Sequence, residues 1–156
     1  MGFGQSIKTV YSKYATFSGR ASRGEFWWFL LFDFLVNLVL MALNTIARNA
    51  GIVSPETTTP AVHLLALFNL GTFIPLLALY ARRLHDTGRS AAFLLLFLIA
   101  GLGALILLVL CASAGQPGPN QYGDDPVDTG RGAQSFGHPV QPAQQASYGR
   151  PPYGGQ

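Results

Sequence analysis

Charge is scarce in this sequence and is confined to a few short stretches. Only 11% of the 156 residues are Asp, Glu, Lys or Arg, whereas 49% are hydrophobic. A soluble protein distributes its charges over the surface, so long blocks without charge indicate a lipid environment. The formal net charge of +3 is too small to indicate a nucleic-acid-binding protein. The composition therefore argues against a soluble domain and predicts no nucleic acid partner.

The sequence also has few residues that form disulfides or bind metals. The chain has one cysteine, Cys111, which excludes an internal disulfide and lies in an apolar run typical of a small buried hydrophobe. The histidines (His63, His85 and His138) fall in separate segments, so no metal-binding spacing is present. There is no Gly-x-Ser-x-Gly elbow and no paired acidic motif for phosphotransfer. We therefore expect no metal, no cofactor and no enzymatic activity.

Three long apolar blocks dominate what is present, at residues 26–47, 61–81 and 91–113. Each has the roughly 20 residues needed to cross a bilayer core. A spanning segment must be helical, because its backbone groups find no partners in lipid. Trp27, Trp28 and Tyr80 stand at block ends, where interfacial aromatic residues are expected. The sequence predicts an all-α, multi-pass integral membrane protein with three transmembrane helices in a membrane domain over residues 25–114.

The two flanking segments differ from this domain. Residues 1–24 carry one helical stripe of apolar residues with Lys8 and Lys13 beside it, so this amphipathic segment either lies in the membrane interface or packs as a short soluble helix. Residues 115–156 are rich in Gly, Pro and Gln and are predicted to be mostly disordered, although their turn-rich start, "GQPGPNQYGDDP", is compatible with partial order. The stripe consists of Phe3, Ile7, Val10, Tyr14 and Phe17.

Basic residues near the ends of the blocks predict the orientation. Cytoplasmic loops of membrane proteins carry an excess of Lys and Arg. Four basic residues precede the first block and three lie in the hinge between the second and third blocks, whereas the loop 48–60 has only Arg48. We expect the N-terminus and the hinge to lie in the cytoplasm and the C-terminal tail to lie outside. A re-entrant third block or a fourth crossing would place the tail inside instead.

Polar residues within the first two blocks form one stripe on each expected helix. Their angular positions place the members of each stripe on one face. The two stripes should turn toward each other, because hydrogen bonds between them replace unsatisfied groups in lipid. We expect Asp33 to be protonated or to bond an arginine or Asn69. The stripe residues are Asp33, Asn37, Asn44, Asn69 and Thr72.

Two functions are compatible with these stripes. The favoured interpretation is a contact that holds the first two spans together. The alternative is a proton or ion relay in an oligomeric small transporter or channel component. Pro75 lies within the second block, so it should leave the carbonyl of Gly71 free for another partner.

A second group of polar residues should converge at the cytoplasmic ends of the spans. Arg20 or Arg23 is expected to pair with Asp86, and Arg82 or Arg83 with Glu25. The alternative is a cradle for an anionic lipid head group, another phosphorylated ligand or a partner protein. The partners considered are membrane lipids, a second copy of the chain and another membrane protein. The cluster consists of Arg20, Arg23, Glu25, Arg82, Arg83, His85, Asp86 and Arg89.

Three motifs carry a family resemblance: "GRASRGEFW" before the first block, "ARRLHDTGRSA" between the second and third, and "GQPGPNQYGDDP" after the third. Together they resemble the bacterial domain of unknown function 805 family over residues 8–126. The resemblance implies a small, multi-span inner-membrane protein of bacterial origin and no established activity. The leading hypothesis is therefore a non-enzymatic membrane protein that binds anionic lipids or a partner.

Overall fold

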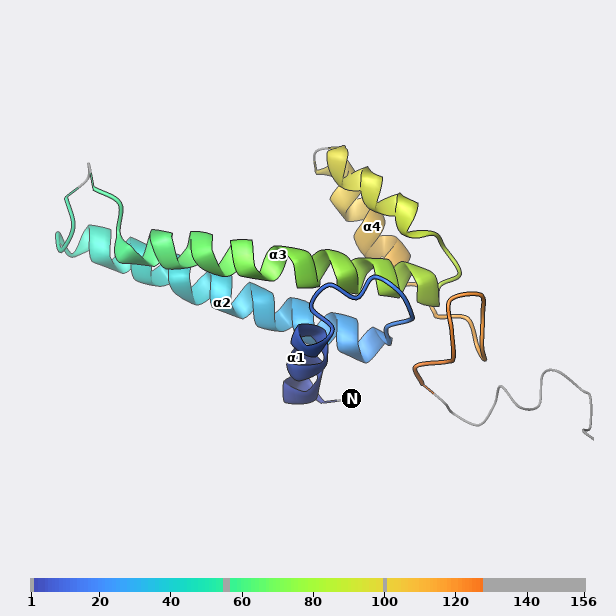
Figure 1. Ribbon diagram of the computed structural model, residues 1–156. Helices are drawn as coiled ribbons and strands as arrows, with labels where there is room; N and C mark the ends of the chain where they lie inside the picture. Colours follow the sequence, from blue (N-terminus) through green and yellow to red (C-terminus); the bar gives the residue numbers. More distant parts are fainter. Residues whose placement is uncertain (1, 55–56, 100, 128–156) are drawn as a thin grey trace, which may run out of the picture.

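The computed structural model describes residues 2–54, 57–99 and 101–127 (Figure 1). These residues form helices and connecting loops, with no β-sheet among them. In chain order the elements are α1 (Phe3–Ser12), α2 (Arg23–Asn49), α3 (Pro60–Asp86), a 3₁₀ helix η1 (Ala91–Leu98) and α4 (Leu102–Ala112). The all-helical prediction is therefore confirmed for the described residues.

Helices α2 and α3 form the long antiparallel pair that runs the length of the molecule in Figure 1. Each has 27 residues, and at 1.5 Å per residue each is about 40 Å long, more than the roughly 30 Å of a bilayer core. Both are long and apolar enough to cross a membrane. The side chain of Ser22 caps the first turn of α2 and that of Thr59 caps α3. They correspond to the first two expected spans.

The third apolar block does not form the single helix predicted over 91–113. It folds into η1 and α4, which pack against each other as a hairpin beside α3 (Figure 1). Gly101 supplies the turn with φ of 70°, a conformation that side chains disfavour. Gly103 allows the arms to approach, because a Cβ atom there would lie 1.6 Å from the Leu96 carbonyl oxygen. A third transmembrane helix is therefore not confirmed.

The remaining elements gather around one half of the long pair. Helix α1 crosses α2 steeply on one side, and the hairpin lies on the other side (Figure 1). The buried residues of α2 lie in its first seven positions, at Glu25, Phe26 and Phe29. Those of α3 all lie between Thr72 and Asp86, at the same end of the pair. The core of the protein therefore sits in this half, while the other half consists of α2 and α3 alone.

Helix α1 is shorter than the predicted amphipathic stripe. It ends at Ser12, so Tyr14 and Phe17 lie in the loop that follows it. Val10 is fully buried, whereas Phe3 is exposed and packs edge-on against Trp28, with ring centroids 5.9 Å apart. The helix therefore attaches to the long pair through its C-terminal half and through this aromatic contact.

Residues 113–127 return to the end of the pair where α2 begins and α3 ends. Asn120 and Gly123 form an isolated antiparallel bridge, and the Gln116 N–H donates a 2.8 Å bond to the Asp86 carbonyl. The start of the expected tail thus lies beside the hinge, not at the opposite end as predicted. The rest of the predicted disordered segment, residues 128–156, lies outside the described residues.

Candidate functional site

The predicted polar cluster assembles where α2 begins and α3 ends, a region that we call the charged end. Six of its eight residues are buried: Arg20, Glu25, Arg82, Arg83, His85 and Asp86. Arg23 is exposed and Arg89 is half-buried. Segments that are far apart in the sequence therefore bring their charges together inside the protein.

Asp86 is the centre of this arrangement. One of its carboxylate oxygens, Oδ1, accepts a 2.9 Å bond from Nε of Arg20 and forms an ion pair with Nη2 of the same side chain, also at 2.9 Å. The other, Oδ2, pairs with Nη1 of Arg83. All three side chains are almost completely buried. Because charge-assisted bonds of this kind are directional, one carboxylate fixes both guanidinium groups.

The two arginines also bind backbone carbonyls. Arg20 donates bonds of 2.5 Å to the carbonyls of Gln116 and Gly118. Arg83 donates to Cys111 at 2.8 Å and to Ser113 at 2.5 Å. Arg83 therefore ties the end of α4 to the charged end, and Arg20 ties the following loop to it. These two buried guanidinium groups are therefore bonded within the protein, and Arg83 also lines a cavity.

Arg82 and Glu25 form a third ion pair, with Nη1 and Oε1 separated by 2.7 Å. Of the predicted pairs, Arg20 with Asp86 and Arg82 with Glu25 are thus present, whereas Arg23 does not pair with Asp86 and Arg83 does not pair with Glu25. Nε and Nη2 of Arg82 are buried and have no partner among the described residues. The buried cluster has three arginines and two carboxylates, so it retains one positive charge.

His85 connects the hinge to the loop after α4. Its ring stacks on Tyr122, with ring centroids 3.9 Å apart and planes 5° from parallel. Nδ1 of His85 lies 3.1 Å from the carbonyl oxygen of Gly19. The side-chain amide of Asn120 donates a 3.0 Å bond to the backbone carbonyl of His85. His85 is therefore a packing and bridging residue in this arrangement.

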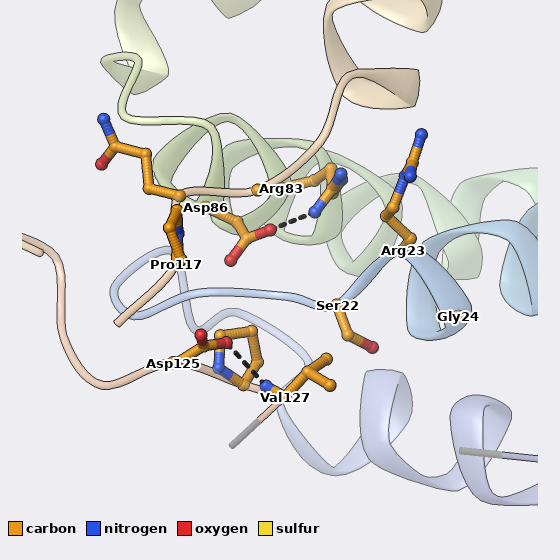
Figure 2. Close-up of a pocket in the computed structure, with 11 residues that line it drawn as sticks. Ser22, Arg23, Gly24, Arg83, Asp86, Pro117, Asp125 and Val127 are labelled. Atoms are coloured by element: carbon orange, nitrogen blue, oxygen red, sulfur yellow. Dashed lines mark hydrogen bonds and ion pairs between the residues drawn. The ribbon is translucent and has the colours of Figure 1, made fainter. Parts of the chain in front are cut away.

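A cavity of about 530 Å³ opens beside these contacts (Figure 2). The charged residues of its lining are Arg23, Arg83, Asp86 and Asp125. Arg83 and Asp86 pair with each other, and Asp125 accepts bonds from the backbone of Gly118 and Val127. The lining is thus balanced in charge, and Arg23 is its exposed cation.

The intramembrane stripe also assembles, with different partners from those expected for Asp33. The Asn69 amide donates a 2.9 Å bond to Oδ1 of Asn37, which joins α3 to α2. The Asn37 amide donates to the Asp33 backbone carbonyl at 2.8 Å and approaches its carboxylate at 3.4 Å. Asp33 bonds neither Asn69 nor an arginine among the described residues, so neither predicted partner is found there, and a protonated Asp33 stays a prediction. Asn37 is the residue that links the two helices.

The two remaining stripe residues lie on either side of this link. Asn44 accepts a 2.7 Å bond from the Thr59 hydroxyl at the far end of the pair. The Thr72 hydroxyl lies 3.3 Å from the Tyr11 hydroxyl of α1. The stripe therefore holds α1, α2 and α3 together at three levels.

Most polar side chains of the charged end and of the stripe bond other described parts of the chain. No group of three or more His, Cys, Asp or Glu among the described residues is placed to hold a metal ion. Cys111 is fully buried in α4. Sequence reasoning missed the role of Gln116, Asn120 and Tyr122 at the charged end. The motif "GQPGPNQYGDDP" contains all three, and its position after the third block was the available signal.

Comparison with known proteins matches residues 14–124 to the family described as "Protein of unknown function (DUF805)". The chain is 42% identical over 118 residues to the inner membrane protein YhaI of Escherichia coli K12, covering 76% of this chain and 92% of that protein. It is 40% identical over 119 residues to the inner membrane protein YhaH of the same organism, covering 75% and 92%. No solved structure gives a significant match.

Proposed function

The chain belongs to the DUF805 family, as its motifs predicted, and we propose that it is a non-enzymatic component of the bacterial inner membrane that binds anionic lipids at its charged end. The supporting observation is the division of the cations in this half of the protein into two sets. Arg20, Arg82 and Arg83 are buried and structural. Lys8, Lys13 and Arg23 are exposed. The lipid contact therefore belongs to the exposed set, with half-buried Arg89 beside it.

Exposed aromatic rings accompany the exposed cations. Trp27 and Trp28 lie in the first turns of α2, and Phe3, Tyr14 and Phe17 lie on or near α1. Trp and Tyr rings prefer the membrane–water interface, and Phe side chains suit the apolar face of a helix that lies there. A helix that crosses the long pair with rings and lysines exposed is suited to lie in the interface plane. This favours the interfacial interpretation of α1 over that of a soluble helix.

Orientation follows from the same charges. The exposed basic residues at the charged end outnumber Arg48, the basic residue of the loop at the other end. By the positive-inside rule, the charged end faces the cytoplasm. The cytoplasmic leaflet carries the anionic lipids, and each Lys or Arg near such a surface contributes about 1 kcal/mol. The proposed lipid contact and the proposed orientation therefore support each other.

We propose a structural role for the intramembrane stripe. Its amides bond each other across α2 and α3, and Asp33 bonds within its own helix. The alternative of an oligomeric transporter or channel gains no support from these bonds, because they join polar groups of the same chain.

The lipid proposal has a direct test, because the two tryptophans of the chain both lie at the charged end. The full chain is reconstituted in vesicles containing dansyl-labelled phosphatidylglycerol or dansyl-labelled phosphatidylcholine, and energy transfer from tryptophan is measured. We expect more transfer to the anionic lipid. The triple variant Lys8→Gln, Lys13→Gln, Arg23→Gln should lose most of this preference, because about 1 kcal/mol is removed per charge. The control Arg48→Gln should keep it; equal transfer to both lipids in the unmodified protein would refute the proposal.

A further inference from the structure

The hairpin of η1 and α4 has the composition of a membrane-embedded element and half the length of a span. No charged residue occurs between Ser90 and Ser113. The eight residues of η1 extend about 16 Å at 2.0 Å per residue, and the eleven of α4 about 16 Å at 1.5 Å per residue. A bilayer core is about 30 Å thick. Each arm therefore matches one leaflet.

Both ends of the hairpin are fixed at the same polar level. Arg89 and the capping residue Ser90 precede η1. At the other end, Arg23 donates a 2.5 Å bond to the Ala112 carbonyl, and Arg83 donates one of equal length to Ser113. A chain that enters and leaves at one polar level cannot cross the membrane between these points.

The surface of the hairpin is apolar on the sides that no other element covers. No residue of η1 is buried, and Leu98, at the end of η1 farthest from the charged end, is 82% exposed. In α4, Leu102, Leu105 and Val109 are exposed in the same way. Because the backbone bonds of both arms close within the hairpin, lipid chains can cover this surface without leaving the arms' polar groups unsatisfied.

We infer that the third apolar block is a re-entrant hairpin that inserts into the leaflet at the charged end, where the acyl chains of that leaflet cover its exposed surface. Helix α1 lies in the same half of the protein on the opposite side of the pair (Figure 1). Residues 113–127 then lie on the same side of the membrane as the N-terminal segment. The inference requires a bilayer but no preference for anionic lipids, so it stands or falls independently of the lipid proposal.

Cysteine accessibility tests this threading. In a Cys111→Ala background, which removes the single native thiol, one cysteine is introduced at a time at four exposed positions: Ser18, Ser54, Leu98 or Asp124. Sealed right-side-out and inside-out membrane vesicles are treated with a membrane-impermeant maleimide. Labelling after detergent solubilisation verifies that each thiol is reactive.

A re-entrant hairpin predicts a distinct pattern of labelling. Ser18→Cys and Asp124→Cys should react from one side, Ser54→Cys from the other, and Leu98→Cys from neither until detergent is added. Reaction of Asp124→Cys from the side of Ser54→Cys would overturn the inference, because the third block would then cross. Reaction of Leu98→Cys in sealed vesicles of either orientation would overturn it as well, because the hairpin would then lie in water.

Discussion

The hydroxyl of Tyr14 donates a 2.7 Å hydrogen bond to the carbonyl of Gly71. Pro75 lies four residues after Gly71 within α3 and has no N–H to bond that carbonyl. The loop after α1 therefore supplies the bond that the proline removes from the helix. The sequence predicted a free carbonyl at Gly71, and the fold identifies its partner. The contact explains how a ten-residue helix is held against a span.

Replacing Tyr14 with Phe should lower the free energy of unfolding by about 1 kcal/mol, the usual contribution of one hydrogen bond. Thermal unfolding in detergent measures the loss. In a Pro75→Ala background the restored N–H bonds Gly71 within the helix, so the same change should cost less. Equal losses in the two backgrounds would show that Tyr14 does not act through this carbonyl.

Asp86→Asn should be among the most damaging single changes at the charged end. The substitution keeps the size of the side chain but leaves Arg20 and Arg83 buried without their counter-charge. Breaking a buried pair in this way costs about 3–5 kcal/mol. The expected readout is a large fall in Tm and in the yield of folded protein. Asp124→Asn, an exposed carboxylate in the same region, is the matched control and should be close to neutral; similar behaviour of the two variants would contradict the role of Asp86.

Asn37→Leu should destabilise the protein more than Asp33→Leu. Asn37 provides the bond between α2 and α3, whereas Asp33 bonds only within α2 among the described residues. A polar contact between membrane helices is worth about 0.6–1.7 kcal/mol, while removing a carboxyl group from a span lowers the cost of burying it in lipid. Thermal unfolding of both variants decides the order. A larger loss for Asp33→Leu would indicate that this carboxyl group has a role that the present contacts do not show.

Gly103→Ala should open the hairpin. The added methyl group would overlap the Leu96 carbonyl oxygen, a backbone atom that moves only if the arm itself shifts. Gly71→Ala is the control, because its Cβ atom meets nothing within 4 Å, and alanine favours a helix over glycine by about 1 kcal/mol. We expect lower Tm for the first variant and unchanged or higher Tm for the second. Tolerance of Gly103→Ala would mean that the arms are not in contact.

The protein should prefer a curved membrane, because it is wider at one end than at the other. Helix α1 and the hairpin widen the protein at the charged end, while the other half has only α2 and α3 (Figure 1). A wedge of this shape fits best where the wider leaflet is convex. Reconstitution into small sonicated vesicles should therefore place the charged end outside more often than reconstitution into large extruded ones. Ser18→Cys and Ser54→Cys in the Cys111→Ala background report the two orientations; an orientation ratio that does not vary with vesicle size would rule out the preference.

Several features of the fold were predictable because they depend on composition or on local geometry. Apolar blocks of 20 residues identified α2 and α3, since only a helix satisfies its own backbone in lipid. Charge complementarity identified the pairs Arg20–Asp86 and Arg82–Glu25, although each was predicted with an alternative. The position of Pro75 within the second block identified the free carbonyl.

A third block that turns back was predicted only as an alternative to a third span, because block length does not reveal a change of direction. Residues 91–113 are as long and apolar as a span, and their glycines were compatible with close helix packing as well as with a turn. The backbone carbonyls that Arg20 and Arg83 bond could not be predicted either, because every residue has a carbonyl and none is marked by its residue type. Only the folded chain brings the carbonyls of Cys111, Ser113 and Gln116 to the guanidinium groups.

The sequence by itself determined that this is a membrane protein, because the clustering of apolar residues into long blocks favours lipid over water whatever the fold. It also determined which end carries the charge. The tertiary structure alone decided what that charge does, because burial turns Arg20, Arg82 and Arg83 from candidate ligand contacts into bonds that close the chain on itself. It likewise decided that the third block turns back, since the direction of an apolar segment depends on where its two ends are held.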